Sequence, residues 1–381
     1  MRWLGLARQY VPKRVRYAIE RFVSLSDLKH RYAAGLDPLA AVTASDVNNY
    51  GAPVRAGILR GTGRGHSRYV AACLELGVPF RVIDVLSSDW LTDLKSAECD
   101  LFFVWPNPHL TTVAKVMKDR CDLIERHLGY SVTPTSNERW MYEDKARTYD
   151  WLRVHDVPHA RTWIFYAHTQ ADEFAASCEL PLVFKTAFGA QAAGVRIIRT
   201  RRALRQVIAR SFGRGFVPGG HDRRDRQWGS VILQEHLAVR KEWRMVRIGD
   251  AYFGHPKGRL GEFHSGSGVV EWDPPTPALL ELLHGVTELG RFRSMNLDIF
   301  ETRDGSLLVN EMQTVFGARH SVDQLRVDGV AGRMVRNGAG WSFEPGDFAR
   351  NACFNARVLD ALETWAQRST ATGTAQLGGA S

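Results

Sequence analysis

Short apolar runs alternate with helix-forming stretches over the first third of the chain, and this order restricts the fold more than any other feature. The run VRAGILR (54–60) is followed by a glycine-rich loop, a helical pattern and a second apolar run, PFRVIDV (79–85). A third run, CDLFFVW (99–105), precedes a longer helical pattern that stops at Gly129. Strands that alternate with helices pair in parallel, because each helix returns the chain to the same end of the sheet. We therefore expect an α/β domain with a parallel sheet over residues 53–140.

The glycine-rich loop after the first run, Gly61 to Gly65, does not fit the common nucleotide-binding loops. Its third glycine is displaced from the G-x-G-x-x-G position, and no acidic residue follows the second run at the place of a ribose partner. A Walker A lysine motif is absent from the sequence. The loop still lies at the carboxyl end of a strand, where parallel sheets bind ligands. Arg60, Arg64 and His66 are therefore candidate substrate-binding residues, with ordinary loop packing as the alternative.

Length and composition are those of a globular protein without membrane spans. The chain has 381 residues, of which 44% are hydrophobic, enough for roughly two or three domains of about 100–200 residues each. No stretch reaches the ~20 apolar residues of a spanning helix, and the N-terminus lacks the apolar core of a secretory signal. The five cysteines are scattered without a C-x-x-C pair, which argues against disulfides and structural zinc. We expect a cytoplasmic protein in a reducing compartment.

The net charge of +9 is concentrated in two segments, 1–52 and 199–227. Solvated basic faces are the simplest interpretation of both. The first segment is expected to be helical and to pack on the protein, and peripheral contact with a membrane surface is the alternative. The second has few aromatic residues for base stacking beyond Phe212, Phe216 and Trp228, so we expect no nucleic acid as a partner. An acidic or phosphorylated carrier is an alternative partner for this segment.

The remaining chain predicts mixed helices and hairpins followed by a helical end. Over residues 141–330, helical patterns alternate with apolar β-prone runs, and tight turns are indicated at Gly249-Asp250 and Asp304-Gly305. Residues 331–381 are expected to contain one helix, FNARVLDALETWAQR, and a disordered tail rich in Ser, Thr, Gly and Ala.

One predicted hairpin carries a set of oxygen-bearing side chains. Asp298 interrupts the apolar run NLDIF, and Glu311 and Gln313 lie in the next strand across the turn. Strand residues two apart share a face, and pairing across the turn can bring Asp298 close to them. Two carboxylates and a neutral amide suit Mg²⁺, which prefers oxygen ligands and is often completed by phosphates. The alternative is an exposed hairpin face with solvated acids.

Two lysines precede this hairpin in a pattern that suggests an anionic ligand. Lys145 opens a helix, and Lys185 ends the apolar run LVFK just before a loop of small residues. Such a loop can let backbone N–H groups approach a ligand closely, and the neighbouring lysine indicates that the ligand is anionic. Further along, Glu235 ends another apolar run and Glu242 follows in the next.

Taken in order, these residues resemble the ATP-grasp superfamily over roughly residues 54–320, in particular its glutamate ligases and D-alanine–D-alanine ligase. The resemblance implies a parallel-sheet pre-ATP-grasp domain (53–140) followed by a two-lobed ATP-grasp domain (141–330). The small lobe would cover about 141–230 and the large lobe about 231–330.

The resemblance also implies roles for these residues in binding ATP and Mg²⁺ or Mn²⁺. Lys145 and Lys185 are similar to the lysines that hold the α- and β-phosphates, and Glu242 to the acid that holds the ribose. Asp298, Glu311 and Gln313 match the metal ligands, with Gln313 in the place of the usual Asn. The remaining implied ATP contacts are a closing loop and an adenine-binding hinge: Gly189, Ala190, Gln191, Ala193 and Gly194 in the loop, and Glu235, His236 and Leu237 in the hinge.

Arg244, Lys257 and Arg259 are the candidates for holding the reacting groups. Many members of the superfamily carry an Arg two residues before the metal-binding Asp, where this chain has Asn296, so we expect that role to pass to Arg244 or Lys257. The segment around His264 and Ser265 is similar to the one that faces substrate in the glutamate ligases, and these two residues are candidate substrate contacts.

The activity implied by the resemblance is an ADP-forming ligase that joins a carboxylate to an amine through an acyl phosphate. Its partners would be small-molecule or peptide carboxylates and amines, and an oligomer is a further expectation. Two alternatives stay open from the sequence. One is phosphoryl transfer to an acceptor other than a carboxylate, and the other is a protein that binds nucleotide without catalysis.

Overall fold

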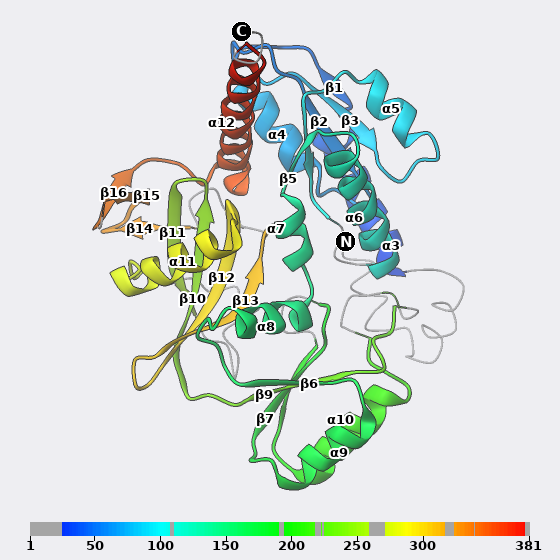
Figure 1. Ribbon diagram of the computed structural model, residues 1–381, viewed down its shortest axis with the longest axis vertical. Helices are drawn as coiled ribbons and strands as arrows, with labels where there is room; N and C mark the ends of the chain where they lie inside the picture. Colours follow the sequence, from blue (N-terminus) through cyan, green and yellow to red (C-terminus); the bar gives the residue numbers. More distant parts are fainter. Residues whose placement is uncertain are drawn as a thin grey trace.

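The computed structural model describes residues 25–106, 110–189, 194–217, 222, 225–258, 271–316, 324–338 and 340–377. In these ranges the strands form three sheets of five, seven and four strands. Figure 1 shows the three sheets at different positions along the long axis of the molecule, with helices α7 and α8 in the middle. The mixed α/β class expected from the sequence is confirmed.

The first sheet is the parallel sheet that the alternating pattern predicted. Strands β2, β3, β4 and β5 pair in parallel, and the order in the sheet is β1-β3-β2-β4-β5. The short strand β1 pairs antiparallel with β3, so part of the segment expected to be helical supplies an edge strand instead. The elements are α3 (Leu25–Gly35), η1 (Pro38–Ala41), β1 (Ala44–Ser45), β2 (Ala56–Arg60), α4 (Ser67–Leu76), β3 (Phe80–Asp84), α5 (Trp90–Ser96), β4 (Leu101–Val104), α6 (Thr111–Arg126) and β5 (Ser131–Thr133).

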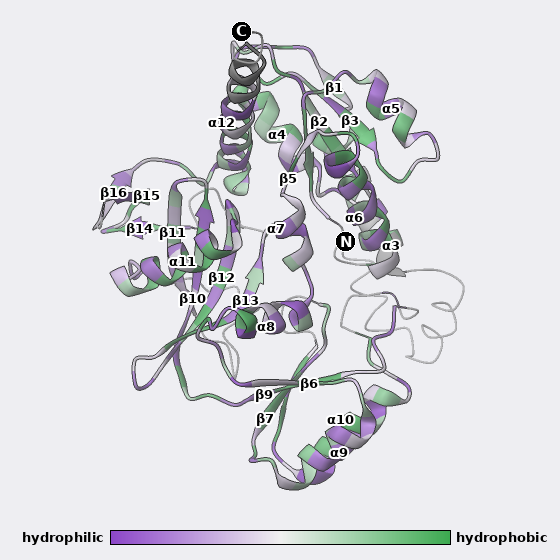
Figure 2. Ribbon diagram, in the orientation of Figure 1, coloured by the Kyte–Doolittle hydropathy of each residue, from purple (hydrophilic) through white to green (hydrophobic). Residues whose placement is uncertain are grey.

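Both faces of this sheet are covered, as the continuous apolar runs require. One face packs with α4 and the C-terminal helix α12 (Arg350–Leu377), and the other packs with α5 and α6. Helix α4 is mostly hydrophobic in Figure 2, whereas α10 carries hydrophilic stretches.

The second sheet is small and antiparallel, in the order β6-β9-β7-β8. Helices α9 and α10 pack on one side of it around Phe184, Leu204 and Leu233. On the other side, Ile164 and Ile232 contact the apolar cluster of the large sheet. The elements are α7 (Ser136–Met141), α8 (Lys145–Val154), β6 (Thr162–Phe165), α9 (His168–Ser177), β7 (Leu182–Lys185), β8 (Val195–Ile198), α10 (Arg201–Phe212) and β9 (Val231–Glu235).

The third sheet is built on the two hairpins that the sequence indicated. Strands β10 and β11 join at Gly249, which has a positive φ of 57°, and β12 and β13 join through the Asp304-Gly305 turn. Helices α8 and α11 pack on this sheet around Leu283, Met295 and Leu297. The elements are β10 (Val239–Ile248), β11 (Ala251–Lys257), α11 (Pro277–Gly290), β12 (Ser294–Thr302) and β13 (Leu307–Gln313).

The C-terminal region is more than the single helix and disordered tail expected for residues 331–381. Strands β14 (Arg326–Val327), β15 (Val330–Asn337) and β16 (Gly340–Pro345) extend the third sheet next to β11. Helix α12 follows and continues to Leu377, into the segment where we expected disorder. Its first turn contains non-helical φ/ψ angles at residues 351–353.

No helix in the described ranges has both the length and the apolar character needed to cross a membrane. All five cysteines are buried and none forms a disulfide, as the scattered spacing predicted. Residues 1–24, which contain much of the basic N-terminal segment, lie outside the described residues.

Candidate functional site

The centre of the candidate site is a row of side chains that crosses the third sheet. In the antiparallel ladders, Arg244 of β10 is the register partner of Asp298 of β12, and Asp298 is the partner of Glu311 of β13. Asn296 is likewise opposite Gln313. The register confirms that pairing across the Asp304-Gly305 turn brings Asp298 to Glu311.

A β-bulge places one residue of this row that sequence reasoning missed. Asp298 pairs with Glu311 but the next residue, Ile299, pairs with Val309, so Asn310 is the extra residue on β13. Bulges re-aim side chains and are frequent beside functional sites. Asn310 is buried, and its amide oxygen accepts a hydrogen bond from Lys185. A signal was present in the sequence, because two polar residues in succession interrupt the alternation of this strand.

Lys257 joins two of the predicted site carboxylates. Its ammonium lies 2.7 Å from Glu242 Oε1 and also donates to Asp298 Oδ2. All three side chains are buried. Burial disfavours the charge on Asp298, but Lys257 and Arg244 outweigh it and hold the pKa of this carboxyl below its ordinary value. Burial also opposes the charge on Lys257, and Asp298 and Glu242 raise the pKa of the lysine nevertheless.

Lys145 forms an ion pair with Glu311, the carboxylate that faces Asp298. It is the first residue of α8, a helix whose N-cap Asp144 accepts a hydrogen bond from the Arg147 backbone. Its ammonium lies 3.1 Å from Glu311 Oε1 and 2.8 Å from the carbonyl oxygen of Gly189. Burial works against both charges, but their attraction lowers the pKa of Glu311 and raises that of Lys145. The pair is therefore ionised at neutral pH.

Lys185 lies beside this pair, and among the described residues its hydrogen-bond partners are a hydroxyl and an amide. Its ammonium donates to Tyr149 Oη at 2.6 Å and to Asn310 Oδ1 at 2.7 Å. Burial lowers the pKa of Lys185 to about 7, even though Glu311 acts in the opposite direction. This lysine consequently changes charge near neutral pH, and an anion beside it would hold the proton in place.

The stems of the small-residue loop between β7 and β8 are tightly held. Thr186 donates its backbone N–H to Gly194 O, and a Cβ on Gly194 would overlap the Thr186 hydroxyl. On the same stem as Thr186, Phe188 exchanges two hydrogen bonds with the Gln227 side chain, each 3.1 Å long. Of the predicted loop contacts, Gly189 and Gly194 are described, and Ala190, Gln191 and Ala193 lie outside the described residues.

The predicted hinge follows the end of β9. Glu235 is the last residue of the strand, and its carboxylate accepts two hydrogen bonds from Arg161, at 2.7 Å from the backbone N–H and 2.9 Å from Nε. The Glu235 side chain is thus engaged within the small sheet. His236 is exposed and Leu237 half-buried, which leaves the backbone as the natural contact at these positions.

Two of the candidate substrate residues near the first glycine-rich loop have partners in the N-terminal part of the chain. Arg60 ends β2 and lies 3.0 Å from Asp84, which ends β3 instead of lying inside it as we expected. His66 is buried with Nε2 3.3 Å from Ala40 O, and Arg64 is exposed. Arg259, His264 and Ser265 lie outside the described residues.

The glycine-rich loop is connected to the metal-ligand candidates through packed residues. Gly65 approaches Trp105, since a Cβ on this glycine would lie 3.2 Å from the indole. Trp105 donates from Nε1 to Tyr142 Oη at 3.2 Å, and the next residue, Glu143, donates its backbone N–H to Gln313 Oε1 at 3.3 Å. The two parts of the predicted site are therefore joined in space.

The side chains present fit a divalent cation only with help from neutral oxygens. Within the described ranges, no three His, Cys, Asp or Glu side chains are grouped as metal ligands. Asp298 and Glu311 form a pair of facing carboxylates, and buried amide side chains lie beside them. Such a donor set suits Mg²⁺ or Mn²⁺ completed by water and phosphate oxygens.

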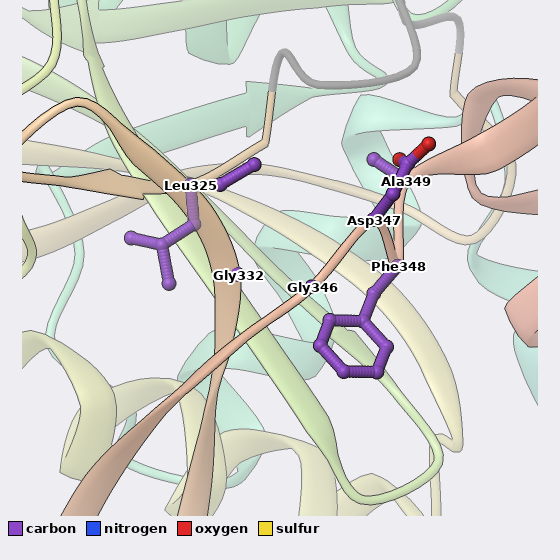
Figure 3. A pocket seen from close by; sticks show the side chains of 7 residues that line it. Leu325, Gly332, Gly346, Asp347, Phe348 and Ala349 are labelled. Carbon is purple, nitrogen blue, oxygen red and sulfur yellow. The ribbon is translucent and has the colours of Figure 1, made fainter.

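A separate hollow lies away from this site, where the β15–β16 hairpin meets the start of α12 (Figure 3). It is lined largely by glycines and apolar side chains, including Leu325 and Phe348, and Asp347 is its acidic residue. This lining offers no group of polar side chains, so we place no function there.

Comparisons with known proteins bear on the fold. No family model matches the chain, and no curated protein matches it. Solved structures do. A RimK domain protein ATP-grasp from Sphaerobacter thermophilus DSM 20745 is 14% identical with a TM-score of 0.51, over 70% of this chain and 92% of that one. The D-alanine–D-alanine ligase from Bacillus anthracis is 12% identical with a TM-score of 0.52, over 83% and 99%.

A third similar structure is the ADP complex of PurK, an N5-carboxyaminoimidazole ribonucleotide synthetase. It is 13% identical with a TM-score of 0.53, over 74% of each chain. At these identities the similarity concerns the arrangement of the elements and leaves the activity of this chain to be argued from its own residues.

Proposed function

Because the chain has the ATP-grasp fold, we propose that it is an ATP-dependent ligase that activates a carboxylate as an acyl phosphate and joins it to an amine. The products would be an amide, ADP and phosphate. The observation that carries this proposal is the convergence of two lysines on neighbouring residues of β13: Lys145 of α8 contacts Glu311, which faces Asp298, and Lys185 of β7 contacts Asn310.

The charges in this site match the parts of a metal–triphosphate complex. Lys145 and Lys185 are buried cations that would hold the α- and β-phosphates, and the stems of the β7–β8 loop place backbone groups next to them. Asp298 and Glu311 would hold Mg²⁺ or Mn²⁺, which would supply positive charge against the charge that develops on the phosphates. Glu242 would accept the ribose hydroxyls, and the backbone of residues 235–237 would contact adenine.

Positioning and charge neutralisation would do most of the chemical work. A carboxylate oxygen of the substrate attacks the γ-phosphorus, the bond to the β,γ-bridging oxygen breaks, and ADP leaves with the electron pair. The amine then attacks the acyl carbon, the carbon–oxygen bond breaks, and phosphate leaves while the nitrogen loses a proton. Arg244 and Lys257, which flank Asp298, would hold the carboxylate and stabilise the charge that develops on the transferring group.

Analysis of the nucleotide products tests this proposal. The protein is incubated with ATP, Mg²⁺ and pooled amino acids, small acids and amines, with Lys185→Ala as the matched control. We expect ADP and phosphate from the wild type only, and splitting the active pools then identifies the carboxylate and the amine. A second assay adds hydroxylamine, which converts an acyl phosphate into a stable hydroxamate.

The outcomes separate the proposal from its alternatives. AMP and pyrophosphate would rule out the acyl-phosphate route. ADP without a hydroxamate would favour phosphoryl transfer to another acceptor. Thermal stabilisation by ATP and Mg²⁺ without turnover of any pool would support a protein that binds nucleotide without catalysis.

A further inference from the structure

One buried oxygen in the site has no hydrogen-bond partner among the described residues. Asn296 lies on β12 with 1% of its surface exposed, and its Nδ2 donates to Asp298 Oδ1 at 3.1 Å. Its Oδ1 is buried and accepts no hydrogen bond. Buried polar atoms in folded proteins nearly always have a partner, so an unpaired one beside an active-site carboxylate calls for a ligand.

The other amide of the site, that of Gln313, has hydrogen-bond partners at both its oxygen and its nitrogen. Gln313 Oε1 accepts the backbone N–H of Glu143 at 3.3 Å, and Gln313 Nε2 donates to Glu311 Oε1 at 3.0 Å. Both ends of the Gln313 amide are thus used inside the protein. Its oxygen, which the sequence pattern offered as a metal ligand, is directed to the main chain after α7.

Neighbouring groups fix the orientation of both amides. Exchanging the oxygen and nitrogen of Asn296 would place its carbonyl oxygen against the Asp298 carboxylate. The same exchange in Gln313 would place an NH₂ group against the Glu143 N–H and an oxygen against Glu311. Because each exchange replaces a hydrogen bond with a repulsive contact, the hydrogen-bond network permits one orientation of each amide.

We propose that Asn296 Oδ1, and not Gln313 Oε1, is the neutral oxygen that binds the divalent cation together with Asp298 and Glu311. Asn296 and Asp298 are two residues apart on β12 and therefore share a face. Gln313 is then a positioning residue that holds Glu311 through its Nε2. This inference rests on the proposed function, since it assigns a ligand to the cation that would accompany ATP.

The charge balance of the site favours a neutral ligand at this position. Lys257 and Arg244 already face Asp298, and Lys145 faces Glu311. Lys257 also bonds Glu242, so three carboxylates already meet three cations in these contacts, and the charges balance without a further carboxylate. An amide oxygen adds a donor for a hard cation without requiring another counter-charge.

Binding of Mn²⁺ provides a test that does not depend on turnover. Free Mn²⁺ is measured by electron paramagnetic resonance during titration of the wild type, Asn296→Leu and Gln313→Met, each with and without ADP. Both substitutions replace an amide with an apolar side chain of similar size. Loss of a partner that orients a metal ligand raises the Kd for the metal by ~10-fold or more, which we expect in Gln313→Met because Gln313 holds Glu311. We expect a larger rise of the Kd for Mn²⁺ in Asn296→Leu, because this variant loses a direct ligand. Asn296→Asp, which keeps the oxygen, should bind Mn²⁺ at least as tightly as the wild type.

A cysteine at the same position reports direct contact with the metal. Thiolates bind Cd²⁺, a soft ion, in preference to Mg²⁺, and the bond gives an ultraviolet charge-transfer absorption. We expect Cd²⁺ to produce this band in Asn296→Cys. Gln313→Cys and the wild type, whose five cysteines are buried, serve as matched controls and should not show it.

These measurements distinguish failure of the inference from failure of the proposed function. Unchanged Mn²⁺ binding in Asn296→Leu together with a loss in Gln313→Met would overturn the assignment and leave the ligase proposal standing. If Asn296→Leu fails to fold, the Asn296→Asp titration and the Cd²⁺ band decide the question. A wild type that binds neither Mn²⁺ nor Mn²⁺–ADP would contradict both.

Discussion

The ammonium of Lys185 lies 2.6 Å from the hydroxyl oxygen of Tyr149, inside the protein and at the end of strand β7. Tyr149 in turn donates to the carbonyl oxygen of Asn310, the bulged residue of β13. A lysine held by a hydroxyl and an amide gains much less electrostatic compensation than one held by a carboxylate. Burial therefore lowers the pKa of Lys185 to about 7, and its neutral partners do not offset this effect.

Stability should depend on pH because of this lysine. The folded-state pKa of about 7 is below the ordinary value of 10.5, so between these pH values the unfolded chain binds more protons than the folded one. The free energy of unfolding contributed by Lys185 therefore rises as the pH increases from 7 toward 10.5. Denaturant unfolding of the wild type and Lys185→Met across this range measures the effect, and the difference between the two proteins should widen with pH in favour of the wild type. A constant difference would mean that Lys185 stays protonated.

Nucleotide binding should be coupled to proton uptake at the same residue. A triphosphate beside Lys185 favours its charged form and raises its pKa, so binding at pH 8 takes up as much as about one proton. Isothermal titration of ATP–Mg²⁺ in buffers with different enthalpies of ionisation detects this uptake. Lys185→Arg keeps the charge at all accessible pH values and is the matched control, for which the binding enthalpy should not depend on the buffer.

The ion pair between Lys145 and Glu311 should show strong coupling in a double-mutant cycle. Replacing Lys145 with Met leaves the half-buried Glu311 carboxylate without its closest counter-charge, and breaking a buried pair costs about 3–5 kcal/mol, which we take as the upper limit here. Replacing both residues, as Lys145→Met with Glu311→Gln, removes the uncompensated charge and should recover most of this loss. Additive losses of unfolding free energy in the two single variants would contradict the contact.

The proposed contact of Glu242 with ribose predicts a loss of sugar discrimination. Glu242→Gln weakens an acceptor for the ribose hydroxyls, and a charge-assisted hydrogen bond is worth about 1.5–3 kcal/mol, so the affinity for ATP should fall roughly 10-fold or more. The affinity for 2′-deoxy-ATP should fall less, because one hydroxyl is already missing. Comparing both nucleotides in both proteins isolates this contact from the effect of Lys257, which also bonds Glu242. Equal losses for the two nucleotides would assign the effect to Lys257.

The sequence predicted those parts of the fold that local patterns specify. Apolar runs bounded by glycines gave the parallel sheet, and Gly249 and Gly305, both with positive φ, marked the two hairpins. The β15–β16 hairpin was missed although Gly338, which has a positive φ, directly follows the last residue of β15. Its strands contain few of the buried apolar residues on which the prediction relied.

The candidate site was predictable in its residue types and less so in its contacts. Turn geometry and strand alternation brought Asp298 opposite Glu311 as expected. The bond from Lys257 to Glu242 joins register partners across the predicted Gly249-Asp250 turn. The bonds from Lys257 to Asp298 and from Lys185 to Asn310 join strands that are distant in the sequence. No local periodicity encodes such contacts, and the bulge at Asn310 shifts the alternation by one residue.

The close stems of the β7–β8 loop lead to a last prediction, on Gly194. The Cβ of an alanine there would overlap the Thr186 hydroxyl. The backbone N–H of Thr186 also donates to Gly194 O. Relief of this clash must separate the stems, at a cost of about 1–3 kcal/mol, and the same movement should weaken ATP binding beside Lys185. Gly285→Ala is the matched control, because open space surrounds that glycine within helix α11 and alanine there should stabilise the protein by about 0.5–1 kcal/mol. Thermal unfolding and ATP titration of both variants measure the two effects, and wild-type behaviour of Gly194→Ala would show that the stems can separate freely.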